Sequence, residues 1–279
     1  MLAERDFRYL QDLVHARAAI VLEPGKEYLA LTRLDPVARS AGMGSVGELV
    51  EALRADEGSA LHERVVEALT TNETTFFRDA KAFETLRTVV LPEVLARKER
   101  SRTLSIWSAG CSSGQEPYSV AMLLREDFDL DGWQISILGT EVSTAMLERA
   151  RTGRYGQLEI GRGLPAELRA RYFRPVGEVW EIDPEIRAMV TFERQNLAED
   201  WPVFAPMDLV LMRNVLLYFD RPTRRRVLTA VRGVLAPEGY LLLGAQEQIA
   251  NDVDGFERCS GAPTGWYRRE GTALRAAGA

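Results

Sequence analysis

Cysteine and histidine are scarce in this sequence of 279 residues, which contains two of each: Cys111, Cys259, His15 and His62. Two cysteines at this separation form neither a disulfide framework nor a zinc-binding spacing, and their small number suits a reducing cytoplasm. The two histidines lie far apart in sequence, which favours roles at the surface or in helix packing over catalysis. The sequence therefore offers no motif for a metal centre.

Long apolar runs and an excess of basic residues are also missing. No segment approaches the length of a membrane-spanning helix, and the chain opens with Glu4, Arg5 and Asp6 instead of a signal segment. Lys and Arg number 35 against 41 Asp and Glu, a net charge of −6. These features argue against direct membrane insertion and against a nucleic-acid partner.

The apolar residues that are present, 46% of the chain, suffice for a core in one large or two unequal domains. Residues 1 to about 75 carry only helical patterns. One apolar stripe, at i, i+3, i+7 and i+11, consists of Phe7, Leu10, Val14 and Ala18. A second helical run should end or kink at Asp35-Pro36, because proline removes a backbone donor and restricts the preceding residue.

Two more helices complete this N-terminal part. Ser45 and Glu48 form a capping box at the start of the third helix, and the fourth runs from about Ser59 to Leu69. The four helices predict a small bundle with no visible catalytic constellation.

From residue 103 onward, β and α patterns alternate, which predicts an α/β fold with a parallel sheet. A strand should end at Trp107 to Ala109, a turn of small residues follows between Gly110 and Gly114, and a helix begins near Pro117. The turn has neither the dinucleotide-binding spacing nor the Lys-Ser/Thr pair of a phosphate loop. A cationic or zwitterionic nucleoside is therefore a better ligand for it than a polyphosphate.

The second strand, Ile135 to Gly139, runs into Glu141, and Ser143 can cap the helix after it. A carboxylate just past the second strand is placed to accept hydrogen bonds from ribose hydroxyls. An acid in a surface loop is the alternative interpretation, and the pattern alone leaves both open.

The remaining segments fit the same architecture. Residues 160–195 predict a small antiparallel lobe, with a helix from Pro165 to Tyr172 and short strands near Val179–Ile182 and Met189–Phe192. Later elements are a buried parallel strand, a helix and two final strands: Asp208–Met212, Pro222–Leu235, Tyr240–Leu243 and Gly265–Arg269.

Four segments carry a resemblance to a known family. TTNETTFFRD, WSAGCSSGQEPYSVAMLL, RNVLLYFD and LAPEGYLLLGAQE, in that order, resemble the CheR family of chemotaxis methyltransferases. The resemblance implies a class I (Rossmann-like) methyltransferase sheet with an N-terminal all-helical domain and a small inserted antiparallel β subdomain. The domains expected are 1–75 for substrate recognition and 76–270 for methyl transfer, with the insertion at about 160–195 and a disordered tail at 271–279.

The family's activity implies transfer of methyl from S-adenosylmethionine to glutamate side chains of chemoreceptor cytoplasmic helices, with S-adenosylhomocysteine as product. By resemblance, Arg78 and Tyr218 are catalytic. The cofactor-binding positions are Asn72, Thr74, Arg78, Gly110, Glu116, Glu141, Asn196, Leu197, Asn214 and Val215. The positions expected to face the receptor are Lys26, Arg33 and Arg39.

An acceptor carboxylate is already ionised at neutral pH, so this chemistry requires no general base and no metal. Arg78 can orient the carboxylate and Tyr218 can donate one further hydrogen bond. Two other hypotheses remain: the same chemistry on another signalling protein, and a catalytically idle cofactor-binding scaffold. Retention of both Arg78 and Tyr218 disfavours the scaffold.

The sequence also departs from the family pattern. Glu141 stands where Asp is usual, and Gly-Ala-Gln-Glu at 244–247 replaces the common Gly-His-Ser-Glu. Residues 1–75 hold 8 Lys and Arg against 13 Asp and Glu, although a basic docking face is expected there. The short Phe173–Val179 connection, with one glycine and a proline, predicts that the enzyme does not use a tether to a C-terminal receptor pentapeptide.

Overall fold

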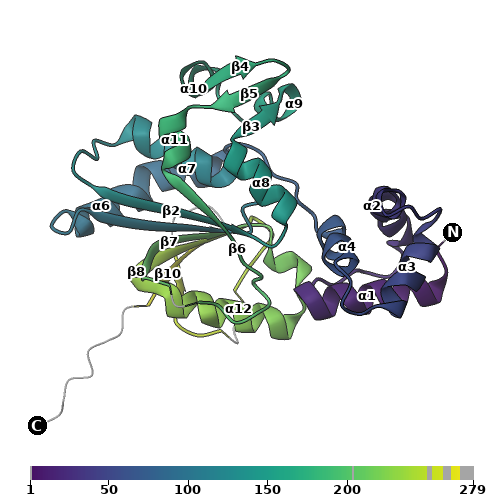
Figure 1. Cartoon of the computed structure of the whole chain (residues 1–279). Helices are drawn as coiled ribbons and strands as arrows, with labels where there is room; N and C mark the ends of the chain where they lie inside the picture. The colour runs from purple at the N-terminus through teal and green to yellow at the C-terminus, as the bar shows by residue number, and fades with distance from the viewer. Residues whose placement is uncertain (1, 203, 250–252, 260–264, 271–279) are drawn as a thin grey trace, which may run out of the picture.

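Between residues 2 and 75, where the description is continuous, four helices form a bundle with its own core (Figure 1). They are α1 (Glu4–Ala18), α2 (Glu27–Ser40), α3 (Val46–Ala55) and α4 (Leu61–Leu69). The computed structural model describes residues 2–202, 204–249, 253–259 and 265–270, so the tail predicted at 271–279 lies outside the described residues. Within these ranges no helix is long and apolar enough to cross a membrane.

The helical patterns of the bundle are confirmed, with one correction each in α3 and α2. The predicted stripe is buried along α1. Ser45 caps α3 as predicted, but only half of the capping box forms, because the Glu48 carboxylate accepts from Gly44 N–H and Ser45 Oγ.

Of the two outcomes predicted at Asp35-Pro36, an end or a kink, the end is wrong, because the helix continues to Ser40. Leu34 and Ala38, on either side of the proline, are fully buried in the bundle core. Their packing outweighs the loss of one backbone hydrogen bond.

The main sheet has seven strands in the described ranges, in the order β6-β2-β1-β7-β8-β10-β9. Their bounds are β1 (Thr103–Ala109), β2 (Gln134–Glu141), β6 (Val190–Arg194), β7 (Met207–Met212), β8 (Leu235–Leu243), β9 (Phe256–Arg258) and β10 (Trp266–Arg269). Neighbours from β6 to β8 are parallel, and β10 pairs antiparallel with β8 and β9. The chain builds outward from β1 in one direction and from β7 in the other, so the strand order reverses between them.

Side chains alternate between two cores, one on each face of the sheet. Leu209 and Leu211 of β7 join one core, and Val210 and Met212 join the other. The helices over the first core are α5 (Ala80–Thr85), η1 (Leu86–Val90), α6 (Leu91–Lys98), α7 (Gln115–Asp127), α8 (Thr144–Thr152) and α11 (Pro184–Ala188), and α12 (Arg221–Val234) covers the second (Figure 1). This layering confirms the predicted α/β fold.

A small antiparallel sheet stands beside the main one, as predicted, but its boundaries differ. Its order is β3-β5-β4, formed by β3 (Arg154–Gly156), β4 (Phe173–Val176) and β5 (Val179–Ile182), and α9 (Gln157–Ile160) and α10 (Ala166–Tyr172) accompany it. It thus begins before residue 160. The prediction that Met189–Phe192 belongs to this lobe is wrong, because β6 pairs with β2 at the edge of the main sheet. Val190 and Phe192 alternate into the main core, which fixes that pairing.

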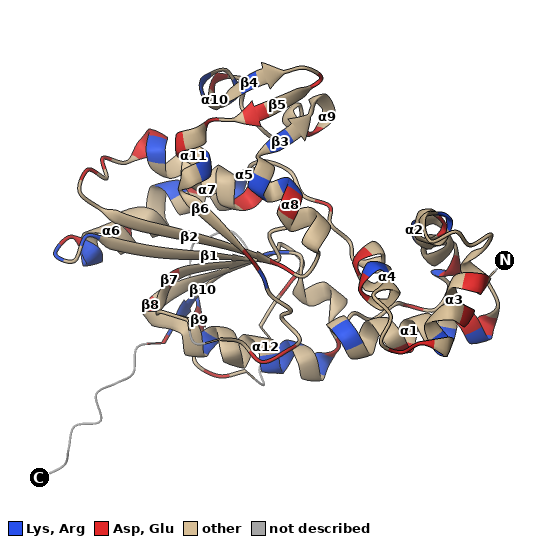
Figure 2. Ribbon diagram, viewed as in Figure 1, with Lys and Arg blue, Asp and Glu red and all other residues tan. Residues whose placement is uncertain are grey.

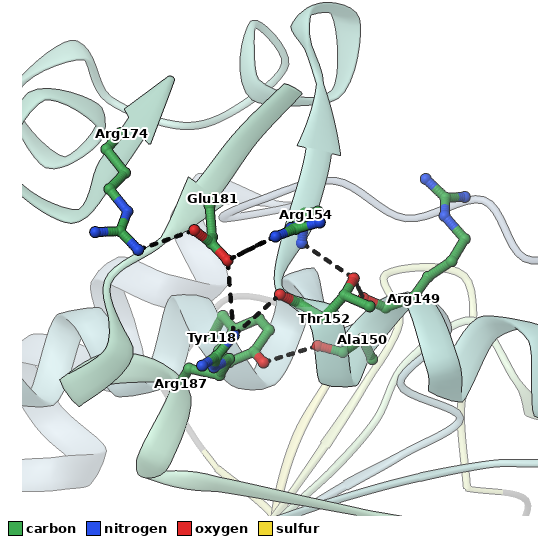
Figure 3. Close-up of polar contacts among 8 residues, drawn as sticks. All are labelled: Tyr118, Arg149, Ala150, Thr152, Arg154, Arg174, Glu181 and Arg187. Carbon is green, nitrogen blue, oxygen red and sulfur yellow. Dashed lines mark hydrogen bonds and ion pairs between the residues drawn. The ribbon is translucent and has the colours of Figure 1, made fainter. Parts of the chain in front are cut away.

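Glu181 of β5 connects the lobe to the helices below it (Figure 3). Its carboxylate lies 3.4 Å from Arg154 Nη2 on β3, 3.0 Å from Arg174 Nη2 on β4 and 3.9 Å from Arg187 Nη1 on α11. The hydrogen bond from Arg174 lowers the pKa of Glu181. One carboxylate thereby joins all three strands of the lobe to α11.

The bundle joins the sheet domain at the end of α1. Ile20 and Phe219 form an isolated antiparallel bridge, and His15 Nε2 lies 2.9 Å from Asp220 Oδ2. Asp220 is also the N-cap of α12. The end of α1 is therefore fixed beside the loop that follows β7.

Candidate functional site

A cleft opens at the carboxyl ends of β1, β2 and β7, where the strand order reverses. Open parallel sheets bind ligands at such a reversal. All residues assigned above to the cofactor and to catalysis line this cleft: Asn72, Thr74, Arg78, Gly110, Glu116, Glu141, Asn196, Leu197, Asn214, Val215 and Tyr218. The bundle contributes Ala18 and Ile20 to the same wall.

The glycine turn after β1 forms the floor of the cleft. The N–H groups of Gly110 and Cys111 donate to the Thr140 carbonyl at 2.8 and 2.9 Å, which ties the turn to the end of β2. Gly110 has a φ of +75°, and a Cβ there would lie 2.6 Å from Val215 Cγ2. Only glycine permits both this conformation and this approach. Burial raises the pKa of the Cys111 thiol far above its usual range, so the thiol stays protonated.

Glu141 is buried at the end of β2, which excludes the alternative of a surface-loop acid. Its Oε2 accepts a hydrogen bond from Ser112 N–H at 2.9 Å, and Oε1 accepts from Val142 N–H at 2.8 Å and Ser143 N–H at 3.1 Å. Burial raises the pKa of Glu141, and these three donors oppose that shift. A carboxylate has about four acceptor positions, so one is left for a hydroxyl of a ligand.

Glu116 forms a buried ion pair that the sequence did not indicate. Its Oε2 lies 3.0 Å from Nη1 of Arg213, and its Oε1 accepts a hydrogen bond from Ser108 Oγ at 2.7 Å. Nη2 of Arg213 donates to the Arg78 carbonyl at 2.6 Å. The Arg213 side chain is 3% exposed, and its Nε has no hydrogen-bond partner in the described part of the chain.

The segment TTNETTFFRD crosses from the bundle into the sheet domain and forms one side of the cleft. The Asn72 carbonyl accepts a hydrogen bond from Ser112 Oγ at 2.8 Å. Phe77 and Asp79 both have positive φ, 47° and 64°, a conformation that costs free energy in non-glycine residues. Arg78 lies between them, and its Nη1 donates to the Glu73 carbonyl at 2.8 Å.

Asn196 and Leu197 differ in what they can offer a ligand. The Asn196 amide donates to the Arg17 carbonyl at 2.6 Å and to Glu199 Oε1 at 2.9 Å, and its oxygen accepts from Ala198 N–H. Its side chain therefore holds α1 against the loop. Leu197 packs in the second core and leaves an apolar surface for the adenine predicted on this side.

The loop after β7 brings Asn214, Val215 and Tyr218 to the cleft. Asn214 has a φ of +59°, and η2 (Leu216–Tyr218) follows it. The Tyr218 carbonyl accepts a hydrogen bond from Val21 N–H at 2.8 Å, so the bundle supports this loop directly. The Tyr218 hydroxyl has no hydrogen-bond partner among the residues that the structure describes.

The three residues expected to face a receptor lie outside the cleft, and one has another role. Arg33 Nη1 donates to the carbonyls of Leu69 and Thr70 at 2.8 and 2.9 Å, and Nη2 donates to Thr71 Oγ1 at 3.0 Å. This arginine therefore closes the end of α4 and positions the start of the junction segment, instead of standing free for docking. Arg39 pairs with Asp35 at 2.6 Å, and Lys26 precedes α2.

Charge over the bundle is mixed, with acidic positions on α1, α3 and α4 (Figure 2). This distribution agrees with the net charge of −5 over residues 1–75, from 8 Lys and Arg against 13 Asp and Glu. In its described residues 2–75, the bundle has no continuous basic face for docking.

The fold and the cleft together define a methyltransferase with a Rossmann-like sheet. A glycine turn, a buried carboxylate after β2 and a polar loop after β7 meet at the point of strand reversal. Comparison with protein-family models then identifies the particular family. Residues 72–264 match the CheR methyltransferase, SAM binding domain, and residues 5–70 match the CheR methyltransferase, all-alpha domain. The chain belongs to the CheR methyltransferase family, and S-adenosylmethionine is its cofactor.

Curated relatives are similar over nearly the whole chain. Chemotaxis protein methyltransferase 1 of Pseudomonas aeruginosa is 40% identical over 271 residues, which cover 95% of this chain and 98% of that protein. Chemotaxis protein methyltransferase Cher2 of Pseudomonas putida is 38% identical, with 92% and 95% covered. A chemotaxis protein methyltransferase of Vibrio parahaemolyticus is 36% identical, with 93% and 95% covered.

The residues of the cleft fit the cofactor. Glu116 and the orphaned Nε of Arg213 offer a carboxylate and a cation side by side, as the zwitterionic amino-acid end of the cofactor requires. Glu141 retains an acceptor position for a ribose hydroxyl, and Leu197 provides an apolar wall. Arg213 was missed from the sequence, where it marked only the end of a strand.

Proposed function

We propose that this chemotaxis methyltransferase transfers methyl to glutamate side chains of chemoreceptor cytoplasmic helices. The observation that carries the proposal is the state of Arg78 and Tyr218. Both line the cofactor cleft. Among the described residues, the Arg78 side chain bonds only to the neutral Glu73 carbonyl, and the Tyr218 hydroxyl has no partner. A guanidinium and a phenol are therefore free to receive an incoming carboxylate.

These positions indicate which steps the cofactor supplies and which the residues of the chain supply. When bound, S-adenosylmethionine supplies the methyl group from its sulfonium. The acceptor carboxylate is ionised at neutral pH, so the chain need not remove a proton from it. Arg78 orients the carboxylate with two parallel N–H groups, and Tyr218 donates one further hydrogen bond. Arg213 pairs with Glu116 at 3.0 Å and is assigned to the amino-acid end of the cofactor, so this second cation does not compete for the acceptor.

Receptor docking is proposed through Lys26, just before α2, and Arg39 on α2, while Arg33 holds α2 to the junction segment. Arg33 connects α2 to residues 69–71, which lead into the cofactor segment at Asn72. A receptor that contacts α2 would therefore lie close to the wall of the cleft. The acceptor and its location in the cytoplasm are both inferred from the family.

A peptide tether is not proposed. In the small sheet β4 is an edge strand, but Pro175 removes one of its four backbone donors. The β4–β5 connection is a tight hairpin with Gly177 at a φ of +61°. These features support recognition of the methylated helices without strand addition by a C-terminal pentapeptide.

The acidic surface of the bundle favours one alternative acceptor. Its net charge of −5, from 8 Lys and Arg against 13 Asp and Glu in residues 1–75, suits a partner with basic side chains around the methylated glutamate. A different signalling protein of that character remains the second candidate.

One assay tests these proposals. The full chain is incubated with S-adenosylmethionine carrying a tritiated methyl group and with receptor cytoplasmic domains, with and without their C-terminal peptide. We expect base-labile label released as methanol, at the same rate for both receptor forms. A receptor whose acceptor glutamates are changed to glutamine is the control. Label that persists on that control contradicts carboxyl methylation, and label that depends on the C-terminal peptide contradicts the tether-free interpretation.

A further inference from the structure

Glu247 lies behind the loop that carries Tyr218. The residue is 5% exposed and is not among those that line the cleft. Oε2 accepts hydrogen bonds from the N–H groups of Asn214 and Gly244, both at 2.7 Å. Oε1 accepts from Val215 N–H at 2.9 Å and from Leu217 N–H at 3.2 Å. One buried carboxylate therefore holds four main-chain donors.

Three of those donors belong to the loop itself. In the described part of the chain, the N–H groups of Asn214, Val215 and Leu217 donate to no main-chain carbonyl. Asn214 and Val215 are half-buried and Leu217 is exposed, but all three N–H groups point at the buried carboxylate. Without Glu247 this loop would lose all three hydrogen bonds or would rearrange.

The loop also has no room to move toward its neighbours. A Cβ on Gly244 would lie 2.7 Å from Glu247 Oε2 and 2.9 Å from Asn214 N, and a Cβ on Gly110 would lie 2.6 Å from Val215 Cγ2. Asn214 has a φ of +59°, a conformation that its surroundings must enforce. The close fit on both sides makes the carboxylate the group that sets the path of residues 214–217.

We propose that Glu247 is a positioning residue for methyl transfer, which fixes the loop 214–218 and thereby the hydroxyl of Tyr218. It acts through the loop and contacts neither cofactor nor acceptor. The proposal rests on the proposed role of Tyr218 in orienting the acceptor. Both carboxylate oxygens are required as acceptors, because each receives two N–H groups.

The test uses Glu247→Gln in the full chain. Glutamine keeps the size of the side chain but points an NH2 group at two N–H donors, so two of the four hydrogen bonds to residue 247 are lost, at least one of them from the loop. We expect kcat to fall roughly 10- to 100-fold, since a displacement of about 1 Å in a reacting group has that scale of effect. The KM for the receptor should stay unchanged. Glu99→Gln, the same change at an exposed residue, is the matched control and should have no effect.

A double-mutant cycle separates positioning from general damage to the fold. If Glu247 acts through Tyr218, Glu247→Gln should lower kcat much less in a Tyr218→Phe background than in the unchanged chain. Independent losses that multiply would overturn the proposal. Glu247→Asp retains the charge and should lose less activity than Glu247→Gln, and it carries the same cycle where the glutamine variant does not fold.

Amide hydrogen exchange supplies a readout that needs no methyl acceptor. Exchange at Asn214, Val215 and Leu217 should accelerate in Glu247→Gln, whereas exchange in β1 should not change. Unchanged protection of the loop would overturn the positioning role. Failure of the unchanged chain to methylate any receptor would instead contradict the proposed function, and the exchange result would still decide whether Glu247 fixes the loop.

Discussion

Glu141 and Glu247 beside the cleft accept hydrogen bonds from main-chain N–H groups, whereas Glu181 in the small lobe is surrounded by arginine side chains. Both arrangements balance a buried carboxylate, but by different means. Main-chain donors are fixed by the strands and turns to which they belong. The arginine side chains around Glu181 are 41–64% exposed and reach it on long flexible stems.

The difference separates the two regions by what they must hold in place. In the cleft, the positions of atoms decide whether a reaction proceeds, so contacts that cannot move independently are used there. In the lobe, the ion pairs of Glu181 connect the three strands to α11, and such a connection tolerates motion. Salt also screens the ion pairs that exposed arginines form with Glu181, whereas it does not screen the main-chain hydrogen bonds to the buried carboxylates of the cleft.

The largest expected effect comes from the two cleft side chains that the structure leaves without a carboxylate partner. Arg78→Ala and Tyr218→Phe should each lower kcat by roughly 10²- to 10³-fold, as loss of a preorganised donor does in other active sites. Binding of S-adenosylhomocysteine, measured by titration calorimetry, should change far less. Arg100→Ala, at an exposed position away from α2, is the matched control. Full activity in both cleft variants would leave the proposed mechanism without its orienting groups.

A smaller effect is expected for the carboxylates assigned to the cofactor. Glu116→Ala and Glu141→Ala should each weaken S-adenosylhomocysteine binding by about 1–3 kcal/mol, because each removes an acceptor from a buried site. Glu141→Ala also leaves three N–H groups unpaired, so calorimetry is done well below its melting temperature. Raising the salt concentration should not change the loss. If Glu181→Ala weakened binding as much as these variants, the distinction between cleft and lobe would be wrong.

Local patterns predicted the glycine turn and the carboxylate after β2, and the resemblance to the CheR family supplied the other cleft residues. The strand, small-residue turn and helix at Trp107–Tyr118 lie within a dozen residues, and the carboxylate of Glu141 follows directly from the end of a strand. The partners of charged residues could not be predicted in this way. Arg213 and Glu116 are 97 residues apart, so neither shows in sequence which group it will meet. Glu247 appeared only as part of an unusual Gly-Ala-Gln-Glu segment.

The errors have the same origin in long-range packing. Val190–Arg194 is a short β pattern that fits either sheet, and only its contact with β2 assigns it to the main one. Pro36 is tolerated because Leu34 and Ala38 are buried around it. In each case tertiary contacts outweighed a local rule.

Asp220 accepts a hydrogen bond from a main-chain N–H, that of Thr223, and also pairs with a side chain, that of His15. We therefore expect the loss of its charge to have an effect between those in the cleft and those in the lobe. The N–H of Thr223 and then the hydrogen bond with His15 lower the pKa of Asp220 to about 2. A lowered carboxyl pKa stabilises the folded chain above the usual value of 3.8, and this contribution disappears as the pH falls toward 2. Asp220→Asn still caps α12, so it removes mainly the charge. The side chain is 34% exposed, so solvent screening limits the loss to less than about 1 kcal/mol.

Urea unfolding of Asp220→Asn and of the unchanged chain at a series of pH values measures this loss. The difference in free energy of unfolding should be constant near neutral pH and should shrink below pH 3.8. His15→Gln should preserve most of the pH dependence, because the main-chain donor makes the larger contribution. A difference that does not vary with pH would mean that the Asp220 charge is not what stabilises the junction.

The smallest effect is expected in the lobe. Glu181→Gln removes the charge that three arginines share but keeps a hydrogen-bond acceptor on β5. Affinity for S-adenosylhomocysteine should remain within about twofold, since exposed ion pairs contribute little and the lobe does not line the cleft. The change should appear in how the melting temperature depends on salt. Added salt screens Glu181 from its arginines in the unchanged chain and so lowers its stability, whereas the variant has no such attraction to lose. Differential scanning calorimetry at low and high ionic strength compares the melting temperatures of the two chains, with Glu178→Gln in the β4–β5 turn as control.

Equal salt dependence of the melting temperature in Glu181→Gln and in the unchanged chain would show that the arginines hold the lobe by packing alone.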